Sequence, residues 1–172
     1  TADTAIIANG AEHRKLGCPG EERLTGRGVS YCATCDGAFF RGKEVCIVGG
    51  GNTALDDALY LAKICKKVYL VHRREGLRAS AVTVHAVMKN EKIVFIPNTQ
   101  LGEIRGENRV ESVLLVEKSG KETVLPVDAV FIAVGLNPHN EIFSDQIELE
   151  DGYIKAGEDC KTNLSGVFVA GD

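Results

Sequence analysis

The sequence lacks the features that mark membrane, nucleic-acid-binding and disulfide-rich secreted proteins. No apolar run approaches the roughly 20 residues that a membrane-spanning helix needs. The 172 residues carry a formal net charge of -4, which leaves no basic footprint for nucleic acid or for an anionic membrane. The first residues do not form a signal peptide, although the chain does not begin with Met and a targeting segment upstream stays open. We therefore expect small molecules or proteins as partners.

Dense cysteine spacing is also lacking. Of the 6 cysteines, only Cys32 and Cys35 lie close together in the sequence. This spacing indicates a reducing compartment, the cytoplasm, and one special pair. With 44% hydrophobic and 26% charged residues, a chain of this length can form one whole domain plus extra pieces. Repeats and low-complexity segments are not evident.

The middle of the chain alternates between predicted strands and helices. A β-branched apolar run stops at three glycines, and apolar residues then recur every three or four positions, which is typical of a helix packed on a sheet. Asn52 can cap that helix. This order predicts a βαβ unit with parallel strands and a right-handed crossover. In chain order we expect strand 44–48, helix 53–66, strand 68–71, helix 80–90 and strand 93–96.

The pattern then changes to short strands and turns. Residues 100–126 predict an antiparallel meander of three strands over one face of the sheet, and residues 128–134 a last buried strand. The predicted fold class is α/β: a Rossmann-like three-layer NAD(P)-binding domain with a parallel sheet and an antiparallel β-meander. Pro138 marks a boundary. Beyond it we expect a hairpin around residues 150–152 and a buried strand at 166–170, where the chain looks truncated.

A glycine turn gives the first sign of a binding site. Gly49-x-Gly51-x-x-Ala54 follows a strand and opens a helix, which is the context of a dinucleotide fingerprint. Gly49 permits the tight turn, Gly51 lets the backbone approach a pyrophosphate, and Ala54 keeps helix and strand close. The helix N-terminus, which includes Asn52 and Thr53, faces the phosphates. The alternative is a glycine-rich turn that binds nothing.

The end of the next predicted strand favours NADP over NAD. An NAD site places an acid about 20 residues beyond the glycines to hold the ribose hydroxyls. Here the sequence has His72-Arg73-Arg74 and then Arg78. Guanidinium groups bind a 2′-phosphate by charge-assisted hydrogen bonds, whereas an acid would repel it. The alternative is a solvated basic strand end, partly neutralised by Glu75.

The cysteine pair indicates redox chemistry. Cys32-Ala33-Thr34-Cys35 places both sulfurs on one face of a first helical turn, within disulfide reach. A helix N-terminus favours the nucleophilic thiolate, and Asp36 can move the proton that thiol–disulfide exchange requires. A zinc site would need a second close pair, and we predict no metal. Two inert buried thiols are the other alternative, which the polar surroundings disfavour.

Taken together, these motifs resemble the low-molecular-weight thioredoxin reductases of the pyridine nucleotide-disulfide oxidoreductase class, over essentially the whole chain. The resemblance rests on residues 32–37, 49–54 and 72–74 in this order and spacing. It implies that Cys32 attacks the thioredoxin disulfide, that Cys35 lies against the flavin and that Asp36 is the acid–base group. The implied electron path runs from NADPH through FAD and the cysteine pair to thioredoxin.

The resemblance also implies a split FAD domain. The family's Ala-Thr-Gly turn and Gly-Asp motif, which contact FAD, match Ala8-Asn9-Gly10, with Asn in place of Thr, and Gly171-Asp172. The family's own FAD glycine turn is absent from this sequence. We therefore expect partial FAD-domain segments at 1–14 and 141–172 around an NADPH-binding domain at 15–140, with hinges near Lys15 and Pro138. The chain alone should bind NADPH but not FAD. Its flanking strands, at 4–7 and 167–169, should lack their usual sheet partners and be frayed or engaged in crystal contacts.

Three other functions stay open at this point. The flavoprotein component of alkyl hydroperoxide reductase shares this architecture, although Ala33-Thr34 within the pair favours thioredoxin reductase. A non-catalytic NADP-binding module and a zinc protein are the others. The resemblance implies that the parent protein is a homodimer.

Overall fold

The computed structural model describes residues 2–171, and the chain divides into two compact units. One unit is Lys15–Val134; the other combines the residues before Lys15 with those after Val134. From the sequence, the second boundary is expected at residue 140. In the structure, Gly135 and the strand after it group with the flanking unit because they are hydrogen bonded to residues 11–14. No helix within residues 2–171 is both long and apolar enough to cross a membrane.

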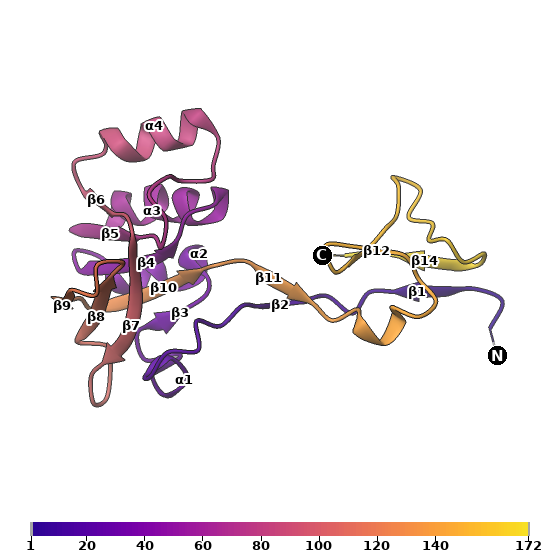
Figure 1. Ribbon diagram of the computed structural model, residues 1–172, viewed down its shortest axis with the longest axis horizontal. Helices are drawn as coiled ribbons and strands as arrows, with labels where there is room; N and C mark the ends of the chain where they lie inside the picture. Colours follow the sequence, from indigo (N-terminus) through magenta and orange to yellow (C-terminus); the bar gives the residue numbers. More distant parts are fainter. Residues whose placement is uncertain (1, 172) are drawn as a thin grey trace. The chain divides into compact units, whose positions relative to one another are not determined.

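The unit Lys15–Val134 is built on a parallel sheet of 5 strands (Figure 1). All neighbouring strands in it run parallel, as the alternation of apolar runs and helices predicted. The strands, in spatial order, are β3 (Val29–Ser30), β10 (Ala129–Ala133), β4 (Glu44–Gly49), β5 (Lys67–Val71) and β6 (Ile93–Ile96).

Each face of this sheet has its own apolar core, because successive strand residues point to opposite faces. On one face, Val45 and Ile47 pack with α3 (Asn52–Ile64), and α4 (Ala81–Lys89) contacts α3. On the other face, Cys46 and Val48 pack with the meander. The meander pairs antiparallel as expected and comprises β7 (Thr99–Arg105), β8 (Ser112–Glu117) and β9 (Glu122–Pro126). The predicted three-layer α/β fold is therefore confirmed.

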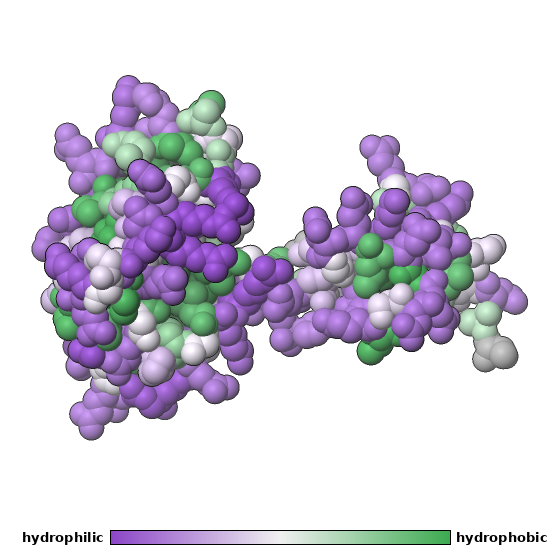
Figure 2. All heavy atoms as spheres, in the orientation of Figure 1, coloured by the Kyte–Doolittle hydropathy of each residue, from purple (hydrophilic) through white to green (hydrophobic). Residues whose placement is uncertain are grey.

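Two short elements between residues 15 and 40 were not predicted: α1 (Glu21–Leu24) and a 3-10 turn, η1 (Gly37–Phe40). Between them, α2 (Ala33–Asp36) is the helical turn expected at the cysteine pair. The side chains of Leu24 and Ala33 are fully buried, on the meander side and the helix side of the sheet respectively. Apolar residues reach the surface between the charged side chains (Figure 2). Phe39 in η1 is one such residue, because it is 81% exposed.

The flanking unit pairs its own strands. β1 (Ala5–Ile7) is parallel to β14 (Val167–Val169), with three residue pairs in register. The expectation that segments 4–7 and 167–169 fray or engage in crystal contacts was wrong, because the two strands pair with each other along one edge. The unit also contains β2 (Ala11–His13) with β11 (Leu136–Pro138), the hairpin β12 (Leu149–Glu150) and β13 (Tyr153–Ile154), and η2 (Glu141–Phe143).

Candidate dinucleotide and redox site

The glycine turn lies between the end of β4 and the start of α3. A Cβ on Gly49 would overlap the carbonyl oxygen of Ala133 and lie 2.6 Å from the Cβ of Ala54. Gly49 therefore permits the close contact between β4, β10 and the first turn of α3. Ala54 is fully buried there, which agrees with its expected role as the small residue between helix and strand.

Gly51, not Asn52, is the N-cap residue of α3, and no side chain caps the helix. The expectation that Asn52 caps was wrong because its Oδ1 accepts a hydrogen bond from the backbone N–H of Ser80 (3.0 Å). The first N–H groups of a helix have no partner within it. The exposed start of α3, at Asn52 and Thr53, thus presents unpaired donors and the positive end of the helix dipole.

The segment after β5 is tied to this turn. The N–H of Arg78 donates to the carbonyl of Gly50 (2.6 Å), and Arg78 and Gly51 form an isolated parallel bridge. Together with the contact from Ser80 to Asn52, these bonds hold residues 78–80 against the glycine turn. The glycine turn and the arginine segment are separate in the sequence, and the fold brings them together at the carboxyl ends of β4 and β5.

The arginines of this segment are free to receive an anion. Arg73, Arg74 and Arg78 are all exposed, and within residues 2–171 none of their guanidinium groups lies within 4 Å of a carboxylate. The partial neutralisation by Glu75 that we considered is thus not an ion pair. Arg73 and Arg74 line an open hollow of about 470 Å³.

His72 faces the glycine turn. A Cβ on Gly50 would lie 2.6 Å from the Nε2 of His72 and would overlap two other ring atoms. Burial, followed by the charges of Arg73 and Arg78, lowers the pKa of His72, so the ring is neutral at physiological pH. Its Nε2 is buried and has no hydrogen-bond partner among the described residues. His72 therefore supports the turn from behind, whereas the arginines face outward.

The cysteine pair is a disulfide. Cys32 and Cys35 have an S–S distance of 2.02 Å and a Cα–Cα distance of 5.3 Å, so the predicted pairing across one helical turn is confirmed. Cys32 is the N-cap residue of α2, and its Sγ accepts the N–H of Cys35 at 3.2 Å. The Oγ1 of Thr34 lies 3.4 Å from the same sulfur. Cys35 is exposed and Cys32 is half-buried.

Asp36 lies at the end of α2, beside the pair. Its Oδ2 accepts a hydrogen bond of 2.6 Å from the hydroxyl of Ser30, and the same hydroxyl oxygen accepts the N–H of Cys32 at 3.1 Å. Ser30 is buried (6% exposed) and joins the carboxylate to the backbone of the redox pair. Sequence analysis missed Ser30, because a serine at the end of a two-residue strand carries no distinctive pattern.

Cys18 and Cys46 do not extend the site. Burial raises the pKa of Cys46 to about 12, and burial, then Glu21, raises that of Cys18 to about 11, so both stay protonated. Among residues 2–171, no three Cys, His, Asp or Glu side chains are grouped as metal ligands would be.

The flanking motifs lie in the other unit. The side-chain amide of Asn9 donates to the carbonyl oxygen of His139 (2.5 Å) and to the Oδ1 of Asn140 (3.0 Å). Both of its hydrogens are thus used within the unit. Gly10 and Gly171 have positive φ angles of 70° and 102°, and a Cβ on either would meet no atom within 4 Å. Asp172 lies outside the described residues.

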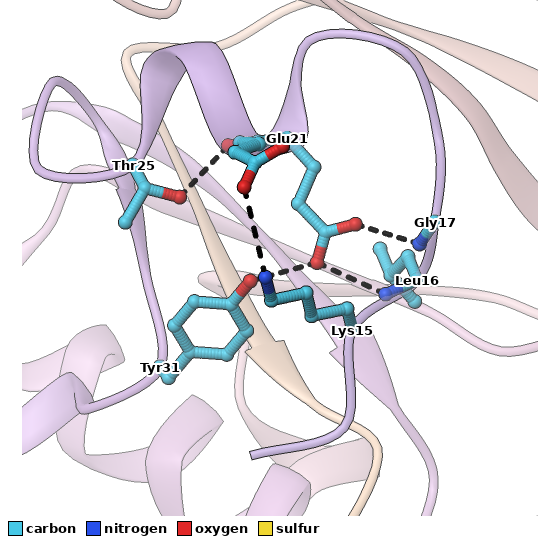
Figure 3. A network of polar contacts seen from close by, with 7 residues as sticks. Lys15, Leu16, Gly17, Glu21, Thr25 and Tyr31 are labelled. Carbon is cyan, nitrogen blue, oxygen red and sulfur yellow. Dashed lines mark hydrogen bonds and ion pairs between the residues drawn. The ribbon is translucent and has the colours of Figure 1, made fainter. Parts of the chain in front are cut away.

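Glu21 is a further polar residue that sequence analysis missed. Its carboxylate is buried and accepts hydrogen bonds from Leu16, Gly17 and Tyr31 (Figure 3). The glycines and prolines around it predict a loop, where a glutamate is ordinarily solvated, so the sequence carries no signal for this network.

Comparison with known proteins identifies the family. The sequence matches the pyridine nucleotide-disulphide oxidoreductase family over residues 1–172. The chain belongs to this family. It is 51% identical over 174 residues to a thioredoxin reductase of Listeria innocua, covering 99% of this chain and 54% of the relative. The thioredoxin reductase of Bacillus subtilis is 45% identical, with 99% and 55% covered.

Solved structures agree with this assignment. The crystal structure of Lactococcus lactis thioredoxin reductase matches with a TM-score of 0.88 and 44% identity, over 98% of this chain and 57% of that one. The thioredoxin reductase of T. acidophilum matches with a TM-score of 0.86 and 35% identity, over 97% and 56%. This chain thus spans about half the length of the relatives that it matches.

Proposed function

We propose that the chain supplies the NADPH-binding domain and the redox pair of a thioredoxin-disulfide reductase. The observation that carries this proposal is the disulfide Cys32–Cys35 in the same unit as a glycine turn flanked by unpaired arginines. When bound, the nicotinamide supplies a hydride to FAD, and the reduced flavin supplies the electrons that open the disulfide. Thioredoxin, which the names of the relatives imply, is the proposed protein substrate.

The fit to NADPH rests on two features of the unit Lys15–Val134. The uncapped start of α3, behind Gly49 and Gly51, offers backbone N–H groups to a pyrophosphate. We propose that Arg73, Arg74 and Arg78 bind the 2′-phosphate, because within residues 2–171 no carboxylate lies within 4 Å of their guanidinium groups and their charge favours NADPH over NADH. His72 contributes by holding the turn. We assign this unit as the NADPH domain.

We assign different roles to the two cysteines. The hydrogen bond from the Cys35 N–H and the contact with Thr34 stabilise a thiolate on Cys32, which makes Cys32 the nucleophile for an external disulfide. The exposed Cys35 is left to exchange electrons with the flavin. Asp36 acts as the acid–base group, and its hydrogen bond to Ser30 orients it beside the pair.

The flanking unit contributes partial FAD-binding segments in this proposal. Gly10 and Gly171 leave open space for a ligand, and Asp172 is proposed to contact it as well. Asn9 is the exception, because its amide is engaged with His139 and Asn140 and can offer FAD only its carbonyl oxygen. The homodimeric parent and the cytoplasmic location stay predictions.

A chimera tests the proposal directly. Residues 1–172 replace the matching segment of the Listeria innocua reductase, which supplies the remaining part of that protein. We expect the flavin-loaded chimera to reduce thioredoxin with NADPH, and the Cys32→Ser and Cys35→Ser versions to lose this activity. The unaltered Listeria reductase is the control. A chimera that holds FAD and oxidises NADPH but leaves thioredoxin oxidised would refute the proposed function.

A further inference from the structure

A buried carboxylate joins the entry of the Lys15–Val134 unit to the redox pair. Glu21 is 3% exposed. Its Oε1 accepts the N–H of Leu16 (2.9 Å) and the phenolic hydroxyl of Tyr31 (2.8 Å), and its Oε2 accepts the N–H of Gly17 (2.7 Å) (Figure 3). One side chain therefore fixes two segments that are separated by ten residues or more along the chain.

The network needs a carboxylate and not merely a polar side chain. Burying a charge is costly unless hydrogen bonds satisfy it, and within residues 2–171 no basic group lies within 4 Å of Glu21. Its partners are all donors. A glutamine would have to turn its own NH₂ group toward one of these donors, which would leave at least one donor without a partner.

Tyr31 transmits this constraint to the active pair because it directly precedes Cys32. On its other side, Ser30 is fixed in the sheet by β10 and accepts the N–H of Cys32 through its hydroxyl. With Ser30 held by the sheet and Tyr31 held by Glu21, the backbone of Cys32 stays in the extended N-cap conformation. In that conformation its sulfur faces the N–H of Cys35.

We propose that Glu21 is a positioning residue of the redox pair, acting through the Tyr31 hydroxyl to keep the Cys32 sulfur beside Cys35. The inference rests on the redox role proposed above. Held in place, the two thiols of the reduced pair have a high effective concentration toward each other, which favours the disulfide. Without the hydrogen bond between Glu21 and Tyr31, the two thiols spend less time in contact, and the disulfide becomes easier to reduce.

The test measures the disulfide equilibrium of the complete chain against dithiothreitol. Dithiothreitol gives up two electrons and two protons and forms its cyclic disulfide, while Cys32–Cys35 becomes two thiols. After acid quenching and alkylation, tryptic peptide 28–41 reports this pair alone, because the four free cysteines fall in other peptides. We expect Glu21→Gln and Tyr31→Phe each to shift the equilibrium about threefold or more toward the dithiol.

The double variant Glu21→Gln/Tyr31→Phe should shift it no further than the larger single change, because Glu21 is proposed to reach the pair only through the Tyr31 hydroxyl. Glu22→Gln, on the exposed neighbour, is the matched control for lost charge. Val87→Ala, which creates a cavity under α4, is the control for lost stability. Both controls should leave the equilibrium of the pair unchanged.

The outcomes separate this inference from the proposed function. A pair that does not exchange with dithiothreitol in the unaltered chain would overturn both. If the unaltered pair exchanges but Tyr31→Phe has the same equilibrium, Glu21 does not act through Tyr31 and the inference is wrong. Should Glu21→Gln fail to fold, Tyr31→Phe alone decides, since it removes only the hydroxyl.

Discussion

The ring of His72 lies so close to Gly50 that the turn can carry no side chain there. We therefore expect Gly50→Ala to displace either the imidazole or the turn and to destabilise the chain by about 1 to 3 kcal/mol. NADPH affinity should fall as well if the turn holds the pyrophosphate, as we propose. Urea unfolding and NADPH titration measure the two effects. Gly76→Ala is the control, since a Cβ there meets no atom within 4 Å. Equal unfolding midpoints and equal affinities for both variants would contradict this prediction.

The exposed arginines should decide the choice of cofactor. Replacing Arg73 and Arg74 with alanine removes charge-assisted contacts worth about 1.5 to 3 kcal/mol each, so NADPH should bind more weakly while NADH is little affected. Titration of both cofactors gives the ratio of affinities, and added salt should weaken NADPH binding more than NADH binding. Arg41→Ala, also exposed, should change neither. An unchanged ratio in the double variant would mean that these arginines do not recognise the 2′-phosphate.

The two thiols should differ in acidity. In Cys35→Ser, the Cys32 thiol keeps the donor N–H of residue 35, so its pKa should lie below the ordinary value for cysteine. Among residues 2–171 no such donor contacts the Cys35 sulfur, so in Cys32→Ser the Cys35 thiol should ionise at a higher pH. The rate of alkylation by iodoacetamide as a function of pH, followed in peptide 28–41, measures both. In the chimera, thiolate–flavin charge-transfer absorbance is expected in Cys32→Ser. Its appearance in Cys35→Ser alone would reverse the roles.

Alkaline pH should destabilise the chain. Burial, then the hydrogen bond to Glu21, raises the pKa of Tyr31 from 10.0 to about 12, and burial raises that of Cys46 from 9.0 to about 12. A group whose pKa is raised by folding keeps its proton longer in the folded state. Its contribution to the free energy of unfolding is fully present below the pKa of the unfolded state and is lost as the pH rises through the pKa of the folded state. The urea midpoint should therefore fall as the pH rises from 9 toward 12.

Cys46→Ala provides the check on that prediction, because it removes one of the groups that titrate late. The variant is expected to lose stability at neutral pH through the small cavity, yet to show a shallower decline at high pH. Cys160→Ala, at an exposed position, should reproduce the decline of the unaltered chain. A slope that is the same in all three chains would show that buried Cys46 does not control the alkaline transition.

The parts of the fold that the sequence predicts are those with local patterns. The run from Val45 to Val48 is buried on both faces and has no polar interruption, and the apolar spacing after it is typical of a helix packed on that sheet. The three glycines mark where the strand ends and the helix begins. Helix, strand and turn therefore follow from neighbouring residues alone, and so does disulfide reach within Cys32–Cys35.

The features that sequence analysis missed depend on contacts between distant segments. Asn52 looks like a cap until the loop that brings the N–H of Ser80 to it is known. Glu21 becomes a buried acceptor only when Tyr31 returns beside α1. Pairing between β1 and β14 joins the two ends of the chain, and no short-range periodicity encodes it.

One hydrogen bond, from the N–H of Arg14 to the carbonyl of Gly135 (2.9 Å), spans the two points where the chain enters and leaves the Lys15–Val134 unit. For the flanking fold, the whole unit is therefore equivalent to the loop of a β-hairpin between β2 and β11. The entropy of closing such a loop grows only slowly with its length, and here the pairing of β2 with β11 holds the ends together. A module with adjacent ends can be inserted into a host sheet, or removed from it and replaced by a tight turn, without rerouting the host chain.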